Sequence, residues 1–338
     1  MNAFFEKAKK INLKYGILQK VKAAFGAVGV GMRKQAMALL PDEGALAQSA
    51  FLLLIAESES ATPEVYVDAI VALELLKAGY EIRDKLVNKS PTFSPHFFLK
   101  DKIDVNYGLL ISDVLISRGL SYLYFNCDRR INNHIDLMVS DIVNSRLDIA
   151  QLLKSESLDL KKYSEIIVRN FGSVIKIGLM TIKTSSIVNP QLLTSISNLA
   201  MNYSVACEFA EDFSGFFGTA ARYNNDLTQI SIENTNLIYP ILLLMELVSS
   251  YEAEMLKNIL ITIKCKGGAP GHKEMWRIKI LMKKYNVIDF ALRKISEHIT
   301  SALSEIKILG WSESETLVDF VNLLLKSNWS VEFINRQS

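Results

Sequence analysis

Cysteine is scarce in this sequence, and its placement argues against two kinds of scaffold. Cys127, Cys207 and Cys265 are the 3 cysteines of the 338 residues, and no two of them form a CxxC pair. A disulfide framework or a zinc site needs more cysteines at closer spacing. Scattered free cysteines are typical of a protein kept in a reducing compartment. We therefore expect a cytoplasmic location.

Long apolar runs are also missing. The longest, 50–56 and 237–248, are shorter than the roughly 20 apolar residues that a helix needs to cross a bilayer. The first ten residues include Glu6, Lys7, Lys9 and Lys10, where a signal peptide needs its apolar core. We expect neither a transmembrane segment nor a signal peptide.

Neither sign of charge dominates. The chain has 38 Lys and Arg against 36 Asp and Glu, a formal net charge of +2, and the two signs are interspersed. Proteins that bind nucleic acid usually have a concentrated basic patch. The sequence therefore gives no reason to expect a nucleic-acid partner.

Proline and glycine are few, which favours long helices. Only 7 Pro and 16 Gly interrupt a chain that is 49% apolar, with a mean hydropathy of +0.18. Apolar residues recur at helical spacing over 65–87, and no convincing run alternates as a half-buried strand does. The same helical pattern fills 107–125, 192–217, 237–256 and 275–308. We expect an all-α protein with an N-terminal helical segment (1–44) and one large helical domain (45–330).

One of these helices resembles a family motif. The segment 72–90 reads ALELLKAGYEIRDKLVNKS. It is similar to the trans-isoprenyl diphosphate synthase helix ALELLHxxxLIHDDxxD, with Asp84 at the first aspartate. Lys85 and Asn88 stand where the family has the second and last aspartates. Further on, Asp113 matches the aspartate of the family's AxLxGDxLLxxA helix.

A second helix resembles the family's other aspartate-rich motif. The segment 204–215 reads SVACEFAEDFSG and is similar to GLAFQxxDDxxD. Glu208 stands at the glutamine, Glu211 and Asp212 at the aspartate pair, and Gly215 at the last aspartate. Spacing of i, i+3 and i+4 puts the three carboxylates on one helical face.

The resemblance implies a fold and a chemistry. It implies a single large helical bundle of the isoprenoid synthase type. In that family carboxylates from two facing helices hold Mg²⁺, which stabilises the departing diphosphate. Carried over by motif, the metal ligands are Glu208, Glu211, Asp212 and Asp84, with Asp84 and Asp212 as the catalytic pair. Lys85, Arg83 and Asp113 are the residues expected to face the diphosphate.

The departures from the motifs bear on activity. The family's GKRLRP segment aligns with 44–49, which has no charge, and its Lys-Thr pair falls near Asn170 and Phe171, beside Arg169. Arg83, Lys85 and Lys89 either bind diphosphate directly or form a solvated face with Asp84. If Lys85 pairs with the acidic helix, the metal site is neutralised from within. Tyr80 lies where family members limit product length by side-chain bulk.

Three functions remain open from sequence. The chain can be a Mg²⁺-dependent prenyltransferase or terpene synthase acting on an allylic prenyl diphosphate. It can be a non-catalytic subunit that pairs with an active prenyl diphosphate synthase. The assembly expected from the resemblance is a homodimer or a heterodimer with such a synthase, formed through the long helices. It can also be an unrelated helical binding protein that shares only the order of the motifs.

Overall fold

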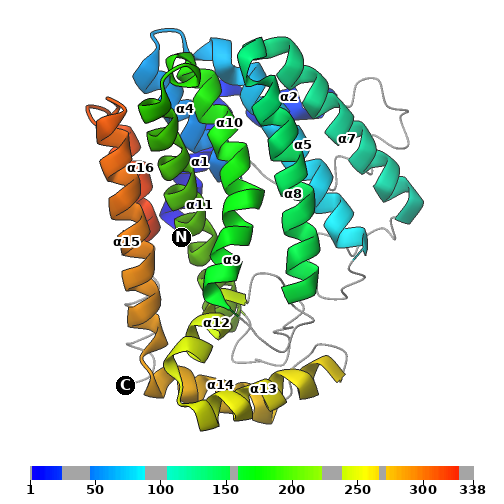
Figure 1. The fold of residues 1–338 in the computed structure, drawn as a ribbon, viewed down its shortest axis with the longest axis vertical. Coiled ribbons are helices and arrows are strands. Elements are labelled where there is room, and N and C mark those ends of the chain that lie inside the picture. The colour runs from blue at the N-terminus through cyan, green and yellow to red at the C-terminus, as the bar shows by residue number, and fades with distance from the viewer. Residues whose placement is uncertain are drawn as a thin grey trace.

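The computed structural model describes residues 2–24, 46–87, 105–152, 159–222, 238–265 and 272–326. Within these ranges every regular element is a helix, which confirms the all-α prediction. Long helices stand side by side as a bundle, and α13 and α14 lie across its lower end (Figure 1).

The helices follow the chain in a simple order. The first half contains α1 (Asn2–Tyr15), α2 (Ile17–Ala23), α4 (Ala47–Glu59), α5 (Val67–Val87), α7 (Val105–Asn126) and α8 (Asn132–Leu152). The second half contains α9 (Leu160–Ile167), α10 (Ser173–Ile182), α11 (Pro190–Arg222), α12 (Ile238–Leu247), α13 (Ser250–Cys265), α14 (His272–Lys284), α15 (Val287–Ile308) and α16 (Glu315–Lys326). Short turns of other helical types are η3 (Pro63–Tyr66), η4 (Arg129–Ile131), η5 (Val168–Gly172) and η6 (Thr184–Ile187).

The long helix α11 lies at the centre of the bundle. It packs along α15 and also touches α9, α10 and α12. Polar contacts fix its register on α15: Asn198 Nδ2 donates to Glu305 Oε1 at 3.0 Å, and Asn202 Oδ1 lies 2.9 Å from His298 Nδ1. The position of α11 therefore depends on several neighbouring helices at once.

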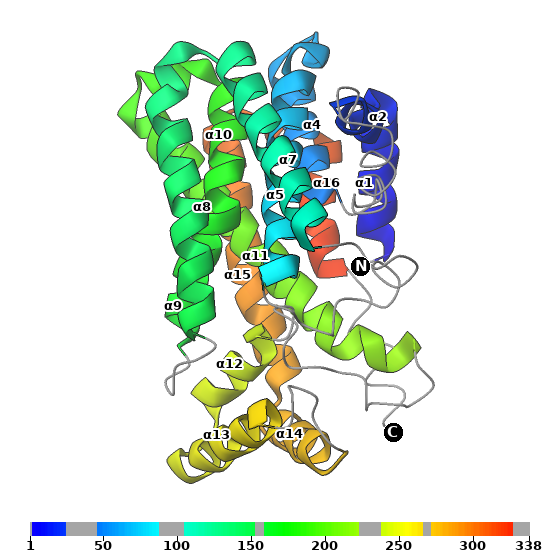
Figure 2. The same cartoon turned by 90° about the vertical axis from the view of Figure 1, so that its right-hand side faces the viewer.

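Among the described helices, α5 and α7 pack against one another most extensively, and glycine residues allow their close approach. A Cβ added at Gly119 would lie 2.8 Å from the carbonyl oxygen of Ala72, and one at Gly79 would lie 2.7 Å from Cγ1 of Ile116. Real Cβ atoms do not approach backbone so closely, so only glycine fits at Gly119. The pairing of 72 with 119 and of 79 with 116 makes the two helices antiparallel (Figure 2).

The N-terminal helix α1 packs against α16, near the C-terminal end of the chain. Phe4 stacks on Phe320 of α16 with ring centroids 4.7 Å apart, and Asn12 Nδ2 donates to the carbonyl of Leu46 at 2.9 Å. Trp311 Nε1 donates to Glu59 Oε2 at 2.6 Å, which fixes the turn before α16 onto α4. The expected domain boundary at residue 44 lies outside the described residues.

Two stretches predicted as single helices are each divided in two. The stretch 237–256 breaks after Leu247, where Ser249 Oγ accepts from the backbone N–H of Glu252 and starts α13. The stretch 275–308 breaks at Asn286, which has a φ of 49° and so leaves the helical region. Both predictions of continuous helix were wrong because apolar periodicity does not register such local breaks.

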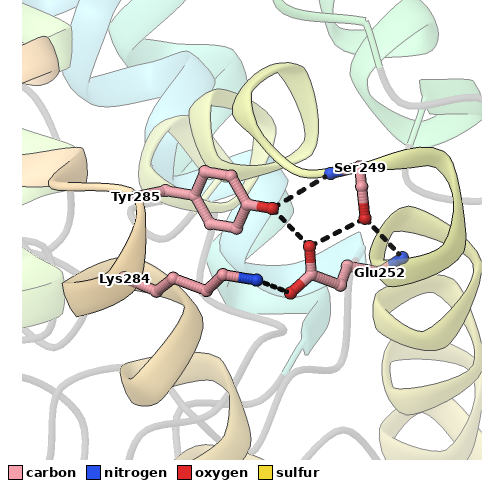
Figure 3. Close-up of polar contacts among 4 residues, drawn as sticks. All are labelled: Ser249, Glu252, Lys284 and Tyr285. Carbon is pink, nitrogen blue, oxygen red and sulfur yellow. Dashed lines mark hydrogen bonds and ion pairs between the residues drawn. The ribbon is translucent and has the colours of Figure 1, made fainter.

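A cluster of polar side chains joins the start of α13 to the end of α14 (Figure 3). Glu252 at the start of α13 binds Lys284 Nζ at 2.6 Å through Oε1. Its Oε2 accepts from Ser249 Oγ at 2.8 Å and from the hydroxyl of Tyr285. The end of α14 is thereby fixed to the first turn of α13.

Candidate functional site: carboxylates of α5 and α11

Two helices supply the charged side chains of the candidate site. On α5, Glu74, Lys77 and Glu81 follow one another at about one-turn intervals, so they share a face. On α11, Glu208 and Glu211 are likewise one turn apart. The two helices are the pair that sequence analysis predicted to face one another.

Lys77 is surrounded by carboxylates. Its Nζ lies 3.9 Å from Oε1 of Glu81 on the next turn of α5. Burial alone would lower the pKa of Lys77, but Glu81, Glu74, Glu211 and Glu208 outweigh that cost and raise it. Lys77 is therefore charged at neutral pH, and its charge interacts with carboxylates of both α5 and α11. Sequence analysis did not single it out.

Glu74 is the deepest of these carboxylates, with 5% of its surface exposed. Ser49 Oγ on α4 donates to its Oε1 at 2.6 Å. Burial raises the pKa of Glu74, against the opposing effects of Lys77 and Ser49. Ser49 belongs to the segment 44–49, which sequence analysis matched with the family's GKRLRP segment, and its hydroxyl binds the carboxylate of Glu74.

Glu208 and Glu211 are half-buried on α11. Burial raises the pKa of both carboxyls, and for Glu208 the neighbouring carboxylates Glu211 and Asp212 raise it further. Lys77 opposes the rise at each of them. Lys77 is thus the cation that opposes the rise at both carboxyls.

Asp212 is placed differently from its two neighbours in sequence. It is buried, and its Oδ2 accepts from the hydroxyl of Tyr163 on α9 at 2.6 Å and from the backbone N–H of Tyr239 on α12 at 3.2 Å. Burial raises its pKa to about 8, although both hydrogen bonds act in the opposite direction. Asp212 therefore joins α9, α11 and α12.

The residues expected to face the diphosphate are only partly described. The guanidinium of Arg83 pairs with Asp113 of α7, and both side chains are substantially exposed. Asp84 and Lys85 lie on α5, but their side chains fall outside the described residues. The structure thus brings Arg83 and Asp113 together as a pair.

A half-buried arginine that sequence analysis missed lies beside α5. Arg146 of α8 donates to the carbonyl oxygen of Tyr80 at 3.3 Å, and its guanidinium carbon lies 5.3 Å from the centre of the Tyr80 ring. Burial lowers its pKa to about 10, with Glu81 acting in the opposite direction. Arg169, which lies beside the position matched with the family's Lys-Thr pair, pairs with Asp148 of α8 at 2.6 Å.

The donor set can be compared with what a metal needs. Among the side chains that the structure describes, no group of three or more His, Cys, Asp or Glu residues could hold a metal ion. Mg²⁺ requires oxygen ligands in near-octahedral geometry. The carboxylates of α5 and α11 instead share an ammonium, which offers no lone pair. The described residues thus fit a divalent cation poorly.

A pocket of about 380 Å³ lies elsewhere, between α13 and α14. Tyr251, Met255, Ile259 and Arg277 are among its lining residues. The helices α13 and α14 lie at the lower end of the bundle (Figure 1). Across the described parts of the chain, no helix is both long and apolar enough to cross a membrane.

Comparison with solved structures shows the fold. The polyprenyl synthetase from Streptomyces coelicolor A3(2) superposes with a TM-score of 0.73 at 14% identity, covering 96% of this chain and 99% of that one. The heptaprenyl diphosphate synthase from Staphylococcus aureus gives 0.73 at 18% identity, covering 95% and 98%. The geranylgeranyl pyrophosphate synthase from Lactobacillus brevis ATCC 367 gives 0.71 at 19% identity, covering 92% and 96%.

These likenesses establish the isoprenoid synthase fold for this chain and, at such identities, the fold alone. Neither a protein-family model nor a curated protein matches the sequence. The fold expected from the motifs is therefore confirmed.

Proposed function

We propose that this chain is a non-catalytic protein with the prenyl diphosphate synthase fold, which pairs with an active prenyl diphosphate synthase. The placement of Asp212 carries the proposal. An aspartate that holds a catalytic cation presents its oxygens to the cleft, but Asp212 accepts from Tyr163 and Tyr239 and joins three helices. The position has a structural role in this chain.

The pairing of Asp113 with Arg83 supports the same interpretation. Ionising an allylic diphosphate needs cations and donors that are available to the leaving group. Arg83 already has a carboxylate partner, Asp113. The segment matched with the family's basic GKRLRP motif has Ser49 instead, and Ser49 binds Glu74. The synthase fold is therefore kept while its charged groups bind one another.

The outer faces of α7 and α8 support a partner role. Leu110 on α7 is 52% exposed, and Leu137 and Leu147 on α8 are 60% and 59% exposed. Large apolar side chains that are exposed to solvent can form part of a protein–protein surface. The occupant we propose is a synthase of the same fold, since two such bundles can pair through their long helices.

A second candidate function keeps catalysis. Glu208 and Glu211 are only half-buried and lie on the helix opposite α5, as ligands of a catalytic Mg²⁺ would. In that case the chain acts on an allylic prenyl diphosphate, by chain elongation or cyclisation.

The test measures assembly and activity together. The chain is co-expressed with each intact aspartate-rich prenyl synthase of its source organism, and complexes are detected by size-exclusion chromatography and native mass spectrometry. Leu137→Glu should abolish the complex, while Leu13→Glu on α1, also an exposed leucine, should leave it intact. The partner proposal predicts a defined heterodimer and no pyrophosphate release from the chain alone.

The opposite result is equally clear. Mg²⁺-dependent pyrophosphate release by the isolated chain, lost in Glu211→Gln, would establish the enzyme and overturn the non-catalytic proposal. Failure of every intact synthase to form a complex would overturn the partner role.

A further inference from the structure

The helix α14 has apolar side chains on two opposite sides. Ile278, Leu281 and Met282 are buried, with no more than 4% of their surface exposed. At about 100° of rotation per residue, Trp276 and Ile280 lie on the other side of the helix. Trp276 is 64% exposed and Ile280 is 45% exposed. One apolar stripe of α14 therefore packs into the protein, while a second apolar pair faces solvent.

Basic side chains accompany the exposed pair. Lys273, Arg277 and Lys283 are exposed and share its side of the helix, at spacings of three or four residues. We call Lys273, Trp276, Arg277, Ile280 and Lys283 together the α14 face. The helix has five Lys or Arg against one Glu, in a chain whose formal net charge is only +2. The balanced composition of the whole chain thus conceals a local positive excess.

The acidic residues near α14 leave this excess in place. Glu252 of α13 binds Lys284, which is not part of the α14 face, at 2.6 Å. Glu254 of α13 lies 3.8 Å from a lysine of its own helix. Glu274 lines the cleft between α13 and α14 together with Arg277. The basic residues of the α14 face therefore outnumber the acidic residue that lies beside them.

The placement of α14 suits contact with an extended surface. In both views α13 and α14 lie across the lower end of the bundle (Figure 1, Figure 2). Amphipathic helices that bind a membrane interface lie in its plane, with basic residues on the polar side and Trp or other large apolar residues reaching inward. Tyr251 of α13, which is 82% exposed, adds a second aromatic side chain to this end of the molecule.

We propose that the α14 face binds an anionic membrane surface. Trp276 and Ile280 enter the interfacial region, where Trp is favoured because its ring is apolar and its N–H remains with the headgroups. Lys273, Arg277 and Lys283 bind the headgroups, each contributing about fivefold in affinity. A soluble polyanion would engage the three charges but would leave the exposed apolar pair in water.

The experiment measures binding of the isolated chain to vesicles by co-sedimentation. Vesicles of phosphatidylcholine and phosphatidylglycerol in equal parts should bind the chain, and vesicles of phosphatidylcholine alone should not. Binding should be lost in about 1 M NaCl, where the Debye length falls to about 3 Å. Absence of binding to the anionic vesicles, or equal binding to both kinds, would overturn the proposal.

A double variant tests the charges of the α14 face. Lys273→Gln/Lys283→Gln should weaken binding to the anionic vesicles by about 25-fold, at about fivefold per charge. The matched control, Lys161→Gln/Lys162→Gln, removes two exposed lysines from α9 and should bind as the wild type does. Equal losses in the two double variants would mean that only net charge matters, which contradicts a defined membrane-binding face.

Trp276→Ala separates a membrane from other occupants. It should weaken vesicle binding by about tenfold and leave binding to heparin, a soluble polyanion, unchanged. Phe125→Ala, which removes a side chain on α7 that is 85% exposed, should change neither. Unchanged vesicle binding in Trp276→Ala would overturn the proposal. So would a wild-type dimer that Trp276→Ala dissociates and that binds no vesicles. Each measurement uses the chain alone, so this proposal and the pairing with a synthase fail separately.

Discussion

The hydroxyl of Tyr163 on α9 donates to Oδ2 of Asp212 on α11 at 2.6 Å, inside the bundle. Tyr163→Phe removes this donor and leaves Oδ2 with the backbone N–H of Tyr239 alone. A buried acceptor that loses a partner costs about 1–3 kcal/mol. We expect the free energy of unfolding in urea to fall by that amount.

The matched control for Tyr163→Phe is Tyr251→Phe. Tyr251 is 82% exposed, so loss of its hydroxyl should change stability by less than about 0.5 kcal/mol. Equal effects of the two substitutions would contradict the structural role assigned to Asp212.

Asp212 also gives the protein a pH dependence with a defined sign. Burial raises its pKa to about 8 from an ordinary value of 3.8. The folded state then binds one more proton than the unfolded state between these values, so this carboxyl lowers stability as pH rises from about 4 to about 8. The slope is at most about 1.4 kcal/mol per pH unit for one proton.

Asp212→Asn isolates that contribution. The amide keeps an oxygen that can accept from Tyr163 and Tyr239 but has no proton to lose. Urea unfolding of the wild type and the variant is measured at intervals from pH 5 to pH 8. The stability of Asp212→Asn relative to the wild type should increase with pH, and a constant difference across the range would refute the raised pKa.

The close approach of α5 and α7 predicts a steric effect at Gly119. A Cβ there would lie 2.8 Å from the carbonyl oxygen of Ala72, and backbone cannot rotate away as a side chain can. Gly119→Ala should destabilise the fold by about 1–3 kcal/mol, although alanine is the better helix former. Ser117→Ala, at an exposed position two residues earlier, should be neutral or stabilising. A stabilised Gly119→Ala would show that the helices can separate at little cost.

The ion pair of Arg83 and Asp113 should contribute little to stability. The two side chains are 41% and 59% exposed, so solvent and salt screen their attraction. Asp113→Asn should change the free energy of unfolding by less than about 1 kcal/mol, and by less still in high salt. Loss of Mg²⁺ binding in this variant, with stability unchanged, would assign Asp113 to a metal instead.

The helices and the fold could be predicted from the sequence because apolar spacing and motif order are properties of the chain itself. The two motif resemblances predicted that the charged side chains of the site come from the helices now seen as α5 and α11. The break at Asn286 could not be foreseen, since one residue in the left-handed region leaves the apolar pattern on either side unchanged.

The partners of single carboxylates could not be predicted in the same way. Glu211 and Asp212 are adjacent in sequence, but only Asp212 is held by Tyr163 and Tyr239, which come from distant segments. The sequence did point to a lysine within the acidic site, at Lys85. The structure places Lys77 there, one turn from both Glu74 and Glu81, and that spacing was visible in the sequence. The side chain of Lys85 lies outside the described residues.

The polar cluster at the lower end of the bundle predicts a local response to acid. Hydrogen bonds from Lys284, then Tyr285 and Ser249, lower the pKa of Glu252 to about 2 from an ordinary value of 4.5 (Figure 3). A carboxyl with a lowered pKa stabilises the folded state above its unfolded pKa, and that stabilisation is lost as pH falls through the folded value. The junction of α13 and α14 should therefore weaken between about pH 4.5 and pH 2.

Glu252→Gln should remove this response, because the amide does not titrate over that range. Hydrogen exchange of peptides from 250–265 and 272–284 measures it, and the wild type should exchange faster as pH falls, after correction for the intrinsic rate. Glu254→Gln is the matched control: Glu254 lies on the same helix, is 68% exposed and is 3.8 Å from Lys257. If Glu252→Gln and Glu254→Gln show the same acid response as the wild type, the cluster does not hold α13 against α14.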